Sequence, residues 1–542
     1  MLLKPKYETE KKSVLFFSPF SGIWKHALAE NQVKKSISKY MKVYDVRCEE
    51  YFAEFCTVMS MKRLQVSNSN NEKNAICIGC KKNSEKLKVK NVIHPELDNR
   101  IFQDSDYISL LNNIESMKFG DLFNLKFKLV EIGRIAILET SLHFKKIDLE
   151  FENNELAHYR IKLLHAAKSI LIAKELFSKL EFRIVFIHSP EYSVGGAFAA
   201  YCELQKIKVF NISFSLNMAE RSSSLMIYDW AKYKLLLPQP TLAYSQNYSH
   251  SKSSLKRAGR HLSRILEEES PFVFSSRKKG VSTREFFGIP RNNKIALLVM
   301  SSYDEVFAMY NSGLSKVKTH EGNVFLNQIE WIKETIKFGS NIENLSLIIR
   351  PHPREYGINR NLIVSKHVHM WEEAIRDLPE NVFIDTPKHE FSIYDHLSEV
   401  DCIITGWSSV ALEGMLSGIP CVTYDSSYVL YPPEIHFTGN TKEEYFANII
   451  NALKNGRQDS IIEEATEWFA LLTSLGSIRT SGVLRDFYLF KHFPFTRRIA
   501  DLLSFYFANS IKKFEVRFGH IGKDSVKLKE LVSRELDSVF DL

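Results

Sequence analysis

Two short polar motifs in the second half of the chain combine residue types that suit phosphate binding. In the first, Arg350-Pro-His352-Pro directly follows the apolar run 345–349. The two prolines restrict the backbone on either side of the histidine, so Arg350 and His352 can face an anion at little cost in ordering entropy. A lone histidine usually has a structural role, but a proline-flanked histidine beside an arginine favours a ligand contact.

The second motif is Ser408-Ser409, which follows the apolar run 402–405 and Gly406 and precedes a predicted helix. A helix that begins at the carboxyl end of a parallel strand offers backbone N–H groups and the positive end of its dipole to an anion. Helix capping would explain one serine, but neither the pair nor Glu413 one turn into the helix. We therefore expect both hydroxyls to contact phosphate and Glu413 to accept from ribose hydroxyls.

Two series of apolar strands alternating with helices must position these residues. Near-continuous apolar runs of this kind predict parallel sheets covered on both faces. Ligands of such sheets collect where the strands end. The first series has strands at 13–17, 43–46, 183–187 and 208–212, and the second at 294–300, 345–349, 382–384, 402–405 and 420–423. The sequence therefore predicts an α/β protein with two facing, Rossmann-like, doubly wound domains.

The motifs also resemble those of a known family. The segments that carry the resemblance are Arg350-Pro-His352-Pro, Tyr394-Asp395-His-Leu, Ser408-Ser409-Val-Ala-Leu-Glu413 and Gly418-Ile-Pro420. They resemble the bacterial capsule polysaccharide biosynthesis glycosyltransferases. The His-Pro and Ser-Ser pairs are also similar to those of polysialyltransferases, capsular Kdo transferases and teichoic acid glycerophosphotransferases. The resemblance is specific over 294–425, weaker over 13–50 and 182–212, and absent from the tail.

This resemblance implies the GT-B fold and a donor site in the second domain. It makes His352, Ser408 and Ser409 phosphate ligands of a CMP- or UDP-linked sugar, with Arg350 beside them and Glu413 at the ribose. Catalysis in such a site requires no metal. We expect an acceptor-side domain over 1–248, with a polar, cysteine-containing excursion at about 48–90 and a helical insertion at about 106–180. A basic connector over 249–289 leads to a nucleotide-sugar-binding domain over 290–483, and a helical tail follows over 484–542.

The acceptor side offers three candidate catalytic residues. A transfer that inverts the sugar needs a base for the acceptor hydroxyl's proton. His26 and Glu30 are four residues apart on one predicted helix face and could act as base and orienter; alternatively, Glu30 is a solvated helix residue. Glu191 follows another core strand and is the second carboxylate candidate, while His188 and Tyr192 are expected to line the acceptor cleft.

Four of the seven cysteines fall in the polar excursion. Cys77 and Cys80 form a Cys-x-x-Cys pair, and Cys48 and Cys56 precede them. Thiolates at this spacing suit a structural zinc ion or an iron–sulfur cluster, although the second pair does not have a standard spacing. Reduced, unliganded thiols are the alternative, and an odd number of cysteines argues against a disulfide framework.

Composition places the protein among ordinary globular chains. Its 542 residues are 44% hydrophobic and 25% charged, with a net charge of +8. The first residues lack the pattern of a secretory signal, and no apolar run has the length of a membrane span. We expect a cytoplasmic protein, with the basic and aromatic tail allowing peripheral contact with the inner face of the membrane. No nucleic-acid-binding motif is present.

The sequence thus predicts a glycosyltransferase. It would move a sugar from a nucleotide-sugar donor to a surface polysaccharide, of capsule or lipopolysaccharide, or to a lipid-linked acceptor. Three alternatives remain open: a polyol-phosphate transferase of teichoic-acid type, a sugar-nucleotide epimerase, and a catalytically silent scaffold of a capsule assembly complex. Because proteins of one fold catalyse different reactions, the residues of the site must distinguish these alternatives.

Overall fold

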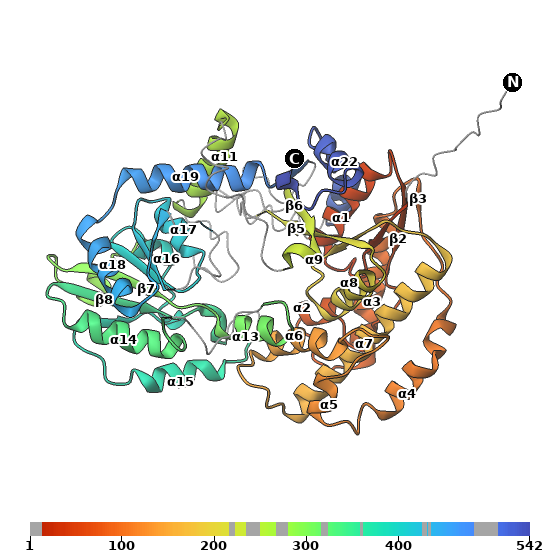
Figure 1. Ribbon diagram of the computed structural model, residues 1–542, viewed down its shortest axis with the longest axis horizontal. Helices are drawn as coiled ribbons and strands as arrows, with labels where there is room; N and C mark the ends of the chain where they lie inside the picture. The colour runs from red at the N-terminus through yellow and green to blue at the C-terminus, as the bar shows by residue number, and fades with distance from the viewer. Residues whose placement is uncertain are drawn as a thin grey trace.

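Two sheets, each with helices on both faces, face each other across the molecule (Figure 1). The computed structural model describes residues 13–215, 223–234, 250–266, 280–315, 324–357, 361–424, 431, 435–481 and 508–541. In Figure 1 the first unit lies on the right and the second on the left. This arrangement confirms the predicted α/β class with two facing, Rossmann-like domains of the GT-B type.

The first sheet has the strand order β14-β13-β6-β5-β4-β1-β2-β3. Its strands are β1 (Ser13–Phe17), β2 (Lys42–Val46), β3 (Val92–Ile93), β4 (Ile184–His188), β5 (Lys208–Phe214), β6 (Ser224–Asp229), β13 (Ile478–Ser481) and β14 (His520–Ile521). The first five are parallel, whereas β6 pairs antiparallel with both β5 and β13. From β3 to β6 the order is that of a Rossmann sheet, with the topological switch point between β1 and β4.

The second sheet repeats this order with six parallel strands, β9-β8-β7-β10-β11-β12. They are β7 (Lys294–Val299), β8 (Leu345–Arg350), β9 (Val382–Ile384), β10 (Cys402–Thr405), β11 (Cys421–Thr423) and β12 (Phe437–Thr438). Alternate residues of β7 point into two separate cores: Leu297 packs with Trp468 on one face, and Leu298 with Trp331 on the other. Burial on both faces explains the near-continuous apolar runs of the sequence.

Helices cover the two faces of the second sheet. On one side lie α14 (Gln328–Ser340), α15 (Lys366–Ala374) and α18 (Lys442–Asn455). On the other lie α12 (Thr283–Phe287), α16 (Ile393–His396), α17 (Val410–Met415) and α19 (Asp459–Ser474). Helix α13 (Tyr303–Asn311) follows β7 and contacts α6 of the first unit (Figure 1).

The insertion predicted at about 106–180 is helical in the structure. It consists of α4 (Ser105–Asn113), α5 (Phe119–Phe123), α6 (Ile132–Phe144) and α7 (Asn153–Lys179). The polar excursion at about 48–90 also leaves the sheet, but it is largely helical: α2 (Thr57–Met61) is followed by α3 (Asn70–Lys86). Helix α3 begins at a capping box, in which Ser69 and Glu72 satisfy each other's backbone N–H groups.

The last part of the chain returns to the first unit. Helix α19 crosses between the units (Figure 1), and β13, α21 (Ala508–Phe518) and α22 (Ser525–Ser533) then pack on the first unit with α1 (Trp24–Ile37). Although β13 lies inside the predicted 290–483 domain, it belongs to the first sheet. The predicted aromatic tail segments at 487–490 and 503–507 lie outside the described residues. No helix in the described ranges is long and apolar enough to cross a membrane.

The predicted basic connector contains α11 (Lys252–Leu266), which packs on α19. Lys252, Lys256 and Arg260 are exposed, as the sequence suggested, whereas Arg257 is buried and donates to the carbonyl of Thr473 over 3.0 Å. Residues 249 and 267–279 of the connector lie outside the described residues. The helix is therefore attached to the second unit through its buried face and exposes a basic one.

Gly133 supports the helix that reaches across to the second unit. A Cβ atom at this position of α6 would lie 2.2 Å from the carbonyl oxygen of Phe123 and 2.4 Å from that of Leu122. Because both obstacles are backbone atoms, Gly133→Ala should lower the free energy of unfolding by about 1–3 kcal/mol. Gly79→Ala in α3, where nothing lies within 4 Å of the added Cβ, is the matched control and should be neutral or stabilising. Urea unfolding measures both, and equal effects would contradict this account.

Candidate functional site at the facing sheet edges

Three strands of the second sheet end at the same level. Thr405 of β10 pairs with Val299 of β7, and Val299 pairs with Arg350 of β8. The loops that follow these strands therefore emerge side by side at the switch point, where a Rossmann sheet binds its ligand. They carry Ser301 and Ser302, His352, and Ser408 and Ser409. The structure thus brings the two predicted donor motifs to one edge.

His352 is held as a neutral imidazole in a positive environment. Its Nδ1 accepts from the backbone N–H of Arg354 over 3.3 Å, which places the ring proton on Nε2. Burial lowers the pKa of His352 to about 3, and the charges of Arg354, Arg350 and Lys145 add to this effect. The ring can therefore donate a hydrogen bond to an anion without carrying charge itself, while the surrounding cations supply the field that attracts the anion.

Arg350, two residues before this histidine, lies in a buried network of hydrogen bonds and ion pairs. Its guanidinium forms an ion pair with Asp385 and donates to the carbonyl of Phe391 over 2.9 Å. Asp385 also accepts from Nε2 of His396 over 2.8 Å. Arg350 is only 7% exposed. Its guanidinium is thus held by protein partners, and a direct contact with phosphate remains a prediction from the sequence.

The Ser-Ser motif precedes the short helix α17. Ser408 Oγ accepts from the backbone N–H of Val410 over 3.3 Å. Ser409, the N-cap residue of α17, is exposed, and its side chain makes no capping hydrogen bond. Glu413 in α17 is 3% exposed, and burial raises its pKa to about 8, opposed by a hydrogen bond with Tyr394, so the protonated form of the carboxyl predominates at neutral pH. Its Oε1 has no hydrogen-bond partner among the described residues. A buried carboxyl in this state suits a ligand hydroxyl.

Sequence inspection missed Arg354 and Lys145, which join the two units. Arg354 Nη2 contacts Asp304 Oδ2 at 2.7 Å and donates to the carbonyl of Leu142 in α6 over 2.9 Å. Lys145, at the end of α6, donates to the carbonyls of Tyr356, over 2.7 Å, and Ile363. Arg354 directly follows the Arg-Pro-His-Pro motif and could have been noticed there. Lys145 has no local signal, because its partners lie more than two hundred residues away.

Carboxylates surround Arg354 at this junction. Asp304 is fully buried and accepts from Ser302 Oγ over 2.6 Å, and Glu305 Oε1 lies 3.3 Å from Nε of Arg354. Burial, with a contribution from Asp304, raises the pKa of Glu305 to about 7 in spite of Arg354. The first turn of α13 therefore holds the His352 loop through Arg354.

The first sheet presents two stacked histidines at its own switch point. Phe17 of β1 pairs with Ile187 of β4, so the loops after these strands are adjacent. The rings of His26, in the first turn of α1, and His188, at the end of β4, stack with centroids 3.9 Å apart. Phe214 packs edge-on against both rings. The structure thus brings together two residues that the sequence proposed separately.

Glu191 and Glu30 both have raised pKa values, and they lie in different surroundings. Glu191 is half-buried in the loop after β4; burial raises its pKa to about 7, opposed by its own backbone N–H and the Ser189 hydroxyl. Glu30 is 6% exposed; burial raises its pKa to about 7, opposed by Lys34 and Ser18. Glu30 is thus a buried residue rather than the solvated helix residue that the sequence left as an alternative.

Tyr192 of the first unit lies within electrostatic range of Arg354 of the second. It immediately follows Glu191 at the start of α8 (Ser193–Leu204), and its hydroxyl lies near enough to Arg354 to affect the pKa of that guanidinium. Through Arg354, the loop after β8 in the second sheet therefore contacts α6 of the first unit and lies within electrostatic range of the start of α8.

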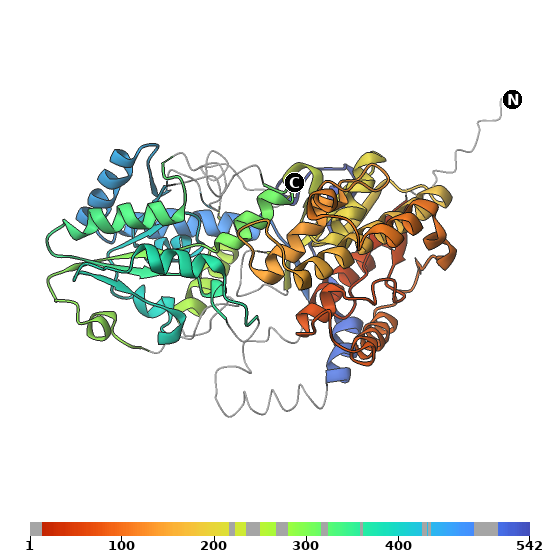
Figure 2. The same ribbon diagram turned by 90° about the horizontal axis from the view of Figure 1, so that it is seen from below.

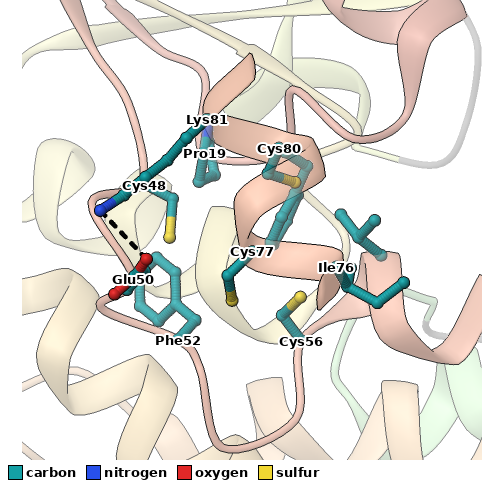
Figure 3. A pocket seen from close by; sticks show the side chains of 11 residues that line it. Pro19, Cys48, Glu50, Phe52, Cys56, Ile76, Cys77, Cys80 and Lys81 are labelled. Atoms are coloured by element: carbon teal, nitrogen blue, oxygen red, sulfur yellow. Dashed lines mark ion pairs between the residues drawn. The ribbon is translucent and has the colours of Figure 1, made fainter. Parts of the chain in front are cut away.

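The four cysteines of the excursion line one pocket. Cys48, Cys56, Cys77 and Cys80 surround it together with Pro19 and Phe20 of the loop after β1, and Figure 3 shows these side chains around the pocket. All four are free thiols, and burial raises the pKa of Cys48 and Cys80 to about 12. Among the described residues, no three His, Cys, Asp or Glu side chains form a group that could hold a metal ion. The predicted structural zinc or iron–sulfur cluster therefore stays a prediction.

The Arg350–Asp385 pair makes a stability prediction. Arg350→Met leaves Asp385 buried with an uncompensated charge and should lower the free energy of unfolding by about 3–5 kcal/mol. Arg376→Met removes the exposed contact with Glu373 at 4.0 Å and should have little effect. Thermal or urea unfolding of both variants measures the difference. An Arg350→Met protein as stable as wild type would show that the buried pair does not support this loop.

Comparison with known proteins finds distant similarity only. No protein-family model and no curated protein matches the chain. Among solved structures, the KpsC β-Kdo 2,4-transferase of Thermosulfurimonas dismutans is 14% identical with a TM-score of 0.33, covering 55% of this chain and 81% of that one. The UDP-GlcNAc 2-epimerase of Methanocaldococcus jannaschii, in complex with UDP-GlcNAc and UDP, is 13% identical with a TM-score of 0.31, covering 85% and 98%.

A third similar structure is the spinosyn rhamnosyltransferase SpnG, which is 8% identical with a TM-score of 0.26 and covers 85% of this chain and 95% of that one. Scores at this level do not establish common ancestry or function. The fold therefore rests on the strand order of the two sheets, and the chemistry rests on the residues of the facing edges.

Proposed function

We propose that the protein is a glycosyltransferase that binds a nucleotide-linked sugar on its second sheet and an acceptor hydroxyl on its first. The observation that carries the proposal is that Arg354, two residues after His352, bonds to α6 of the first unit and lies within electrostatic range of Tyr192, which follows Glu191. One edge presents a neutral histidine among cations, and the other presents a carboxyl with a pKa about 7. A donor phosphate needs the first, and an acceptor hydroxyl needs the second.

On the donor side, His352 would donate its Nε2 proton to a phosphate oxygen of the nucleotide. The hydroxyls of Ser408 and Ser409 and the backbone at the start of α17 would bind the same phosphates. Arg350 would act through the network that holds this loop in place. Glu413, protonated and lacking a partner for Oε1, would bind the ribose hydroxyls.

On the acceptor side, Glu191 is the better candidate for the catalytic base. It precedes Tyr192, which lies within electrostatic range of the donor-side Arg354, and it is half-buried rather than enclosed. Glu30 lies deeper, 4.0 Å from Lys34, and would hold the loop after β1 through the Ser18 hydroxyl. The His26–His188 stack would form the wall of the acceptor cleft. The proposed acceptor is a surface polysaccharide of capsule or lipopolysaccharide type, or its lipid-linked precursor.

Nucleotide binding gives the first test. In a thermal-shift panel of CMP, CDP, UDP, GDP and ADP, at least one nucleotide should raise the Tm. His352→Ala should weaken that nucleotide roughly 10- to 100-fold, as expected for the loss of a hydrogen bond to a charged group worth about 1.5–3 kcal/mol. His369→Ala, an exposed histidine of α15, is the matched control and should bind normally.

The outcomes separate the alternatives. A response to CMP or UDP compounds agrees with the proposed donor. Turnover of the nucleotide-sugar in the absence of any acceptor would instead identify a sugar-nucleotide epimerase, and transfer of a polyol phosphate would identify a teichoic-acid type of transferase. If no nucleotide stabilises the protein, the chain is a silent scaffold and the proposal fails.

The pKa of Glu191 gives the second test. A carboxyl with a pKa about 7 is protonated below that pH and cannot accept a proton there. The kcat/KM should therefore fall about tenfold per pH unit below pH 7 and level off above it. Glu191→Gln should lower kcat by roughly 100- to 10,000-fold. Glu30→Gln should keep most of the activity and the same acidic limb. If Glu30→Gln instead loses the larger factor, Glu30 is the base.

A further inference from the structure

Helix α21 has one face fixed against the acceptor-side helix α1. Nε1 of Trp24 donates to Oε2 of Glu515 over 2.8 Å, and Glu515 is 1% exposed. Nζ of Lys512 lies 4.9 Å from the centre of the Trp24 ring. Lys35 of α1 donates to the carbonyls of Val516 and, over 3.3 Å, Gly519. These contacts set the rotation of α21 and therefore which of its residues face outward.

The outward side of α21 carries Lys513, Phe514, Arg517 and Phe518, which we call the α21 face. The spacing of these residues places them on one side of a helix. Phe514 is 39% exposed and Phe518 is 48% exposed, with ring centroids 4.6 Å apart. Cζ of Arg517 lies 5.3 Å from the centre of the Phe518 ring. Two neighbouring, tilted aromatic rings, with Arg517 over one of them and Lys513 on the same side of the helix, are thus presented to solvent.

The neighbouring helix α3 extends the same chemistry. Lys86 of α3 donates to Asn509 over 2.7 Å, and Lys512 donates to Asn83 over 3.0 Å, so α3 and α21 lie side by side. In Figure 2 the blue helix at the lower edge of the first unit is α21, beside α3. On α3, Ile78 is 51% exposed and Lys82 is also exposed. The acidic residue of α21, Glu515, is buried, so cations predominate on the outward side.

We propose that the α21 face docks on a bilayer that contains anionic lipids. Aromatic rings with lysine and arginine beside them are the composition of helices that lie at the headgroup level of a membrane. Two phenylalanines on one helix are too small an area for a stable protein interface, which buries about 800 Å² on each partner. They are sufficient for shallow insertion, with the cations attracted to lipid phosphates.

Docking would also orient the acceptor site. Trp24, which binds α21, lies in the same first turn of α1 as His26, the residue stacked on His188. A bilayer against α21 would therefore keep the first turn of α1, with His26, close to the lipid headgroups. Resting on the function proposed above, this would let the enzyme reach the hydroxyl of a lipid-anchored acceptor without extracting its lipid.

Vesicle co-sedimentation of the full-length protein tests the docking surface. The probes are vesicles of phosphatidylcholine alone and of phosphatidylcholine mixed with phosphatidylglycerol. The wild type should bind the mixed vesicles. Phe514→Ser with Phe518→Ser should bind them roughly tenfold or more weakly, because two apolar side chains are lost from the bilayer. Lys513→Glu with Arg517→Glu should remove the preference for phosphatidylglycerol. That preference should also weaken as salt is raised.

Leu362→Ser is the control, since this side chain is 82% exposed in the second unit, away from α21. It should bind vesicles like the wild type. All variants should keep the nucleotide thermal shift, which separates failure of docking from failure of the proposed function. The proposal is overturned if the wild type ignores phosphatidylglycerol or if the Phe variant binds as well as it does. It is also overturned if the wild type is a dimer that the Phe variant dissociates.

Discussion

The contact of Arg354 with both units is the interaction on which the functional geometry depends. One guanidinium binds Asp304 of its own unit and the carbonyl of Leu142 in the other, and it lies near Tyr192. Together with Lys145 and the packing of α13 on α6, it fixes the relative orientation of the two sheets. Because Arg354 is two residues from His352, the residue that joins the units also borders the donor site. The Arg354 side chain thus both links the two units and contributes positive charge beside the donor site.

Burial gives the two edges opposite electrostatic characters. On the donor side it keeps His352 neutral, and the neighbouring cations reinforce that state. On the acceptor side it raises the pKa of Glu191 close to neutrality, where a carboxylate is both available and basic enough to accept a proton. Neither effect requires a metal, and both depend on the exclusion of water. Residues that close the junction, such as Lys145 on the carbonyls of Tyr356 and Ile363, therefore contribute to the chemistry without touching a ligand.

Local sequence patterns were enough to predict the strands and the edge to which they deliver the motifs. Apolar runs typical of a parallel sheet predict β7, β8 and β10. The last residues of these strands pair with one another in the structure, so His352 and Ser408 lie at one edge of the sheet, as predicted. The antiparallel strands β6, β13 and β14 were not foreseen, because their pairing joins segments that are far apart in the chain. The spacing of the four cysteines predicted that they lie together, and they line one pocket; the metal between them stays a prediction.

Arg350 illustrates the limit of such patterns. Its type and its place at the end of a buried strand favour anion binding, and both are visible in the sequence. Its partner Asp385 lies after a different strand, and nothing near either residue indicates that they pair. Similarly, the sequence allows Glu30 to be either a catalytic residue or a solvated helix residue, whereas the fold buries it beside Lys34. Residue type and sequence spacing predict the element and the sheet edge to which a side chain belongs. Its ionisation state and its partners depend on contacts between segments that are distant in the sequence.

The strand β13 has a consequence for how the molecule is made. The first strand of the first sheet, β1, begins at Ser13. Strand β13, which pairs with β6 in the same sheet, begins only at Ile478. During synthesis, the edge of β6 must stay unpaired until the whole second unit has left the ribosome. Such distant pairing slows folding, and an open strand edge invites association with other chains. The second unit, whose six strands are continuous in sequence, can fold first and carry β13 back to its place.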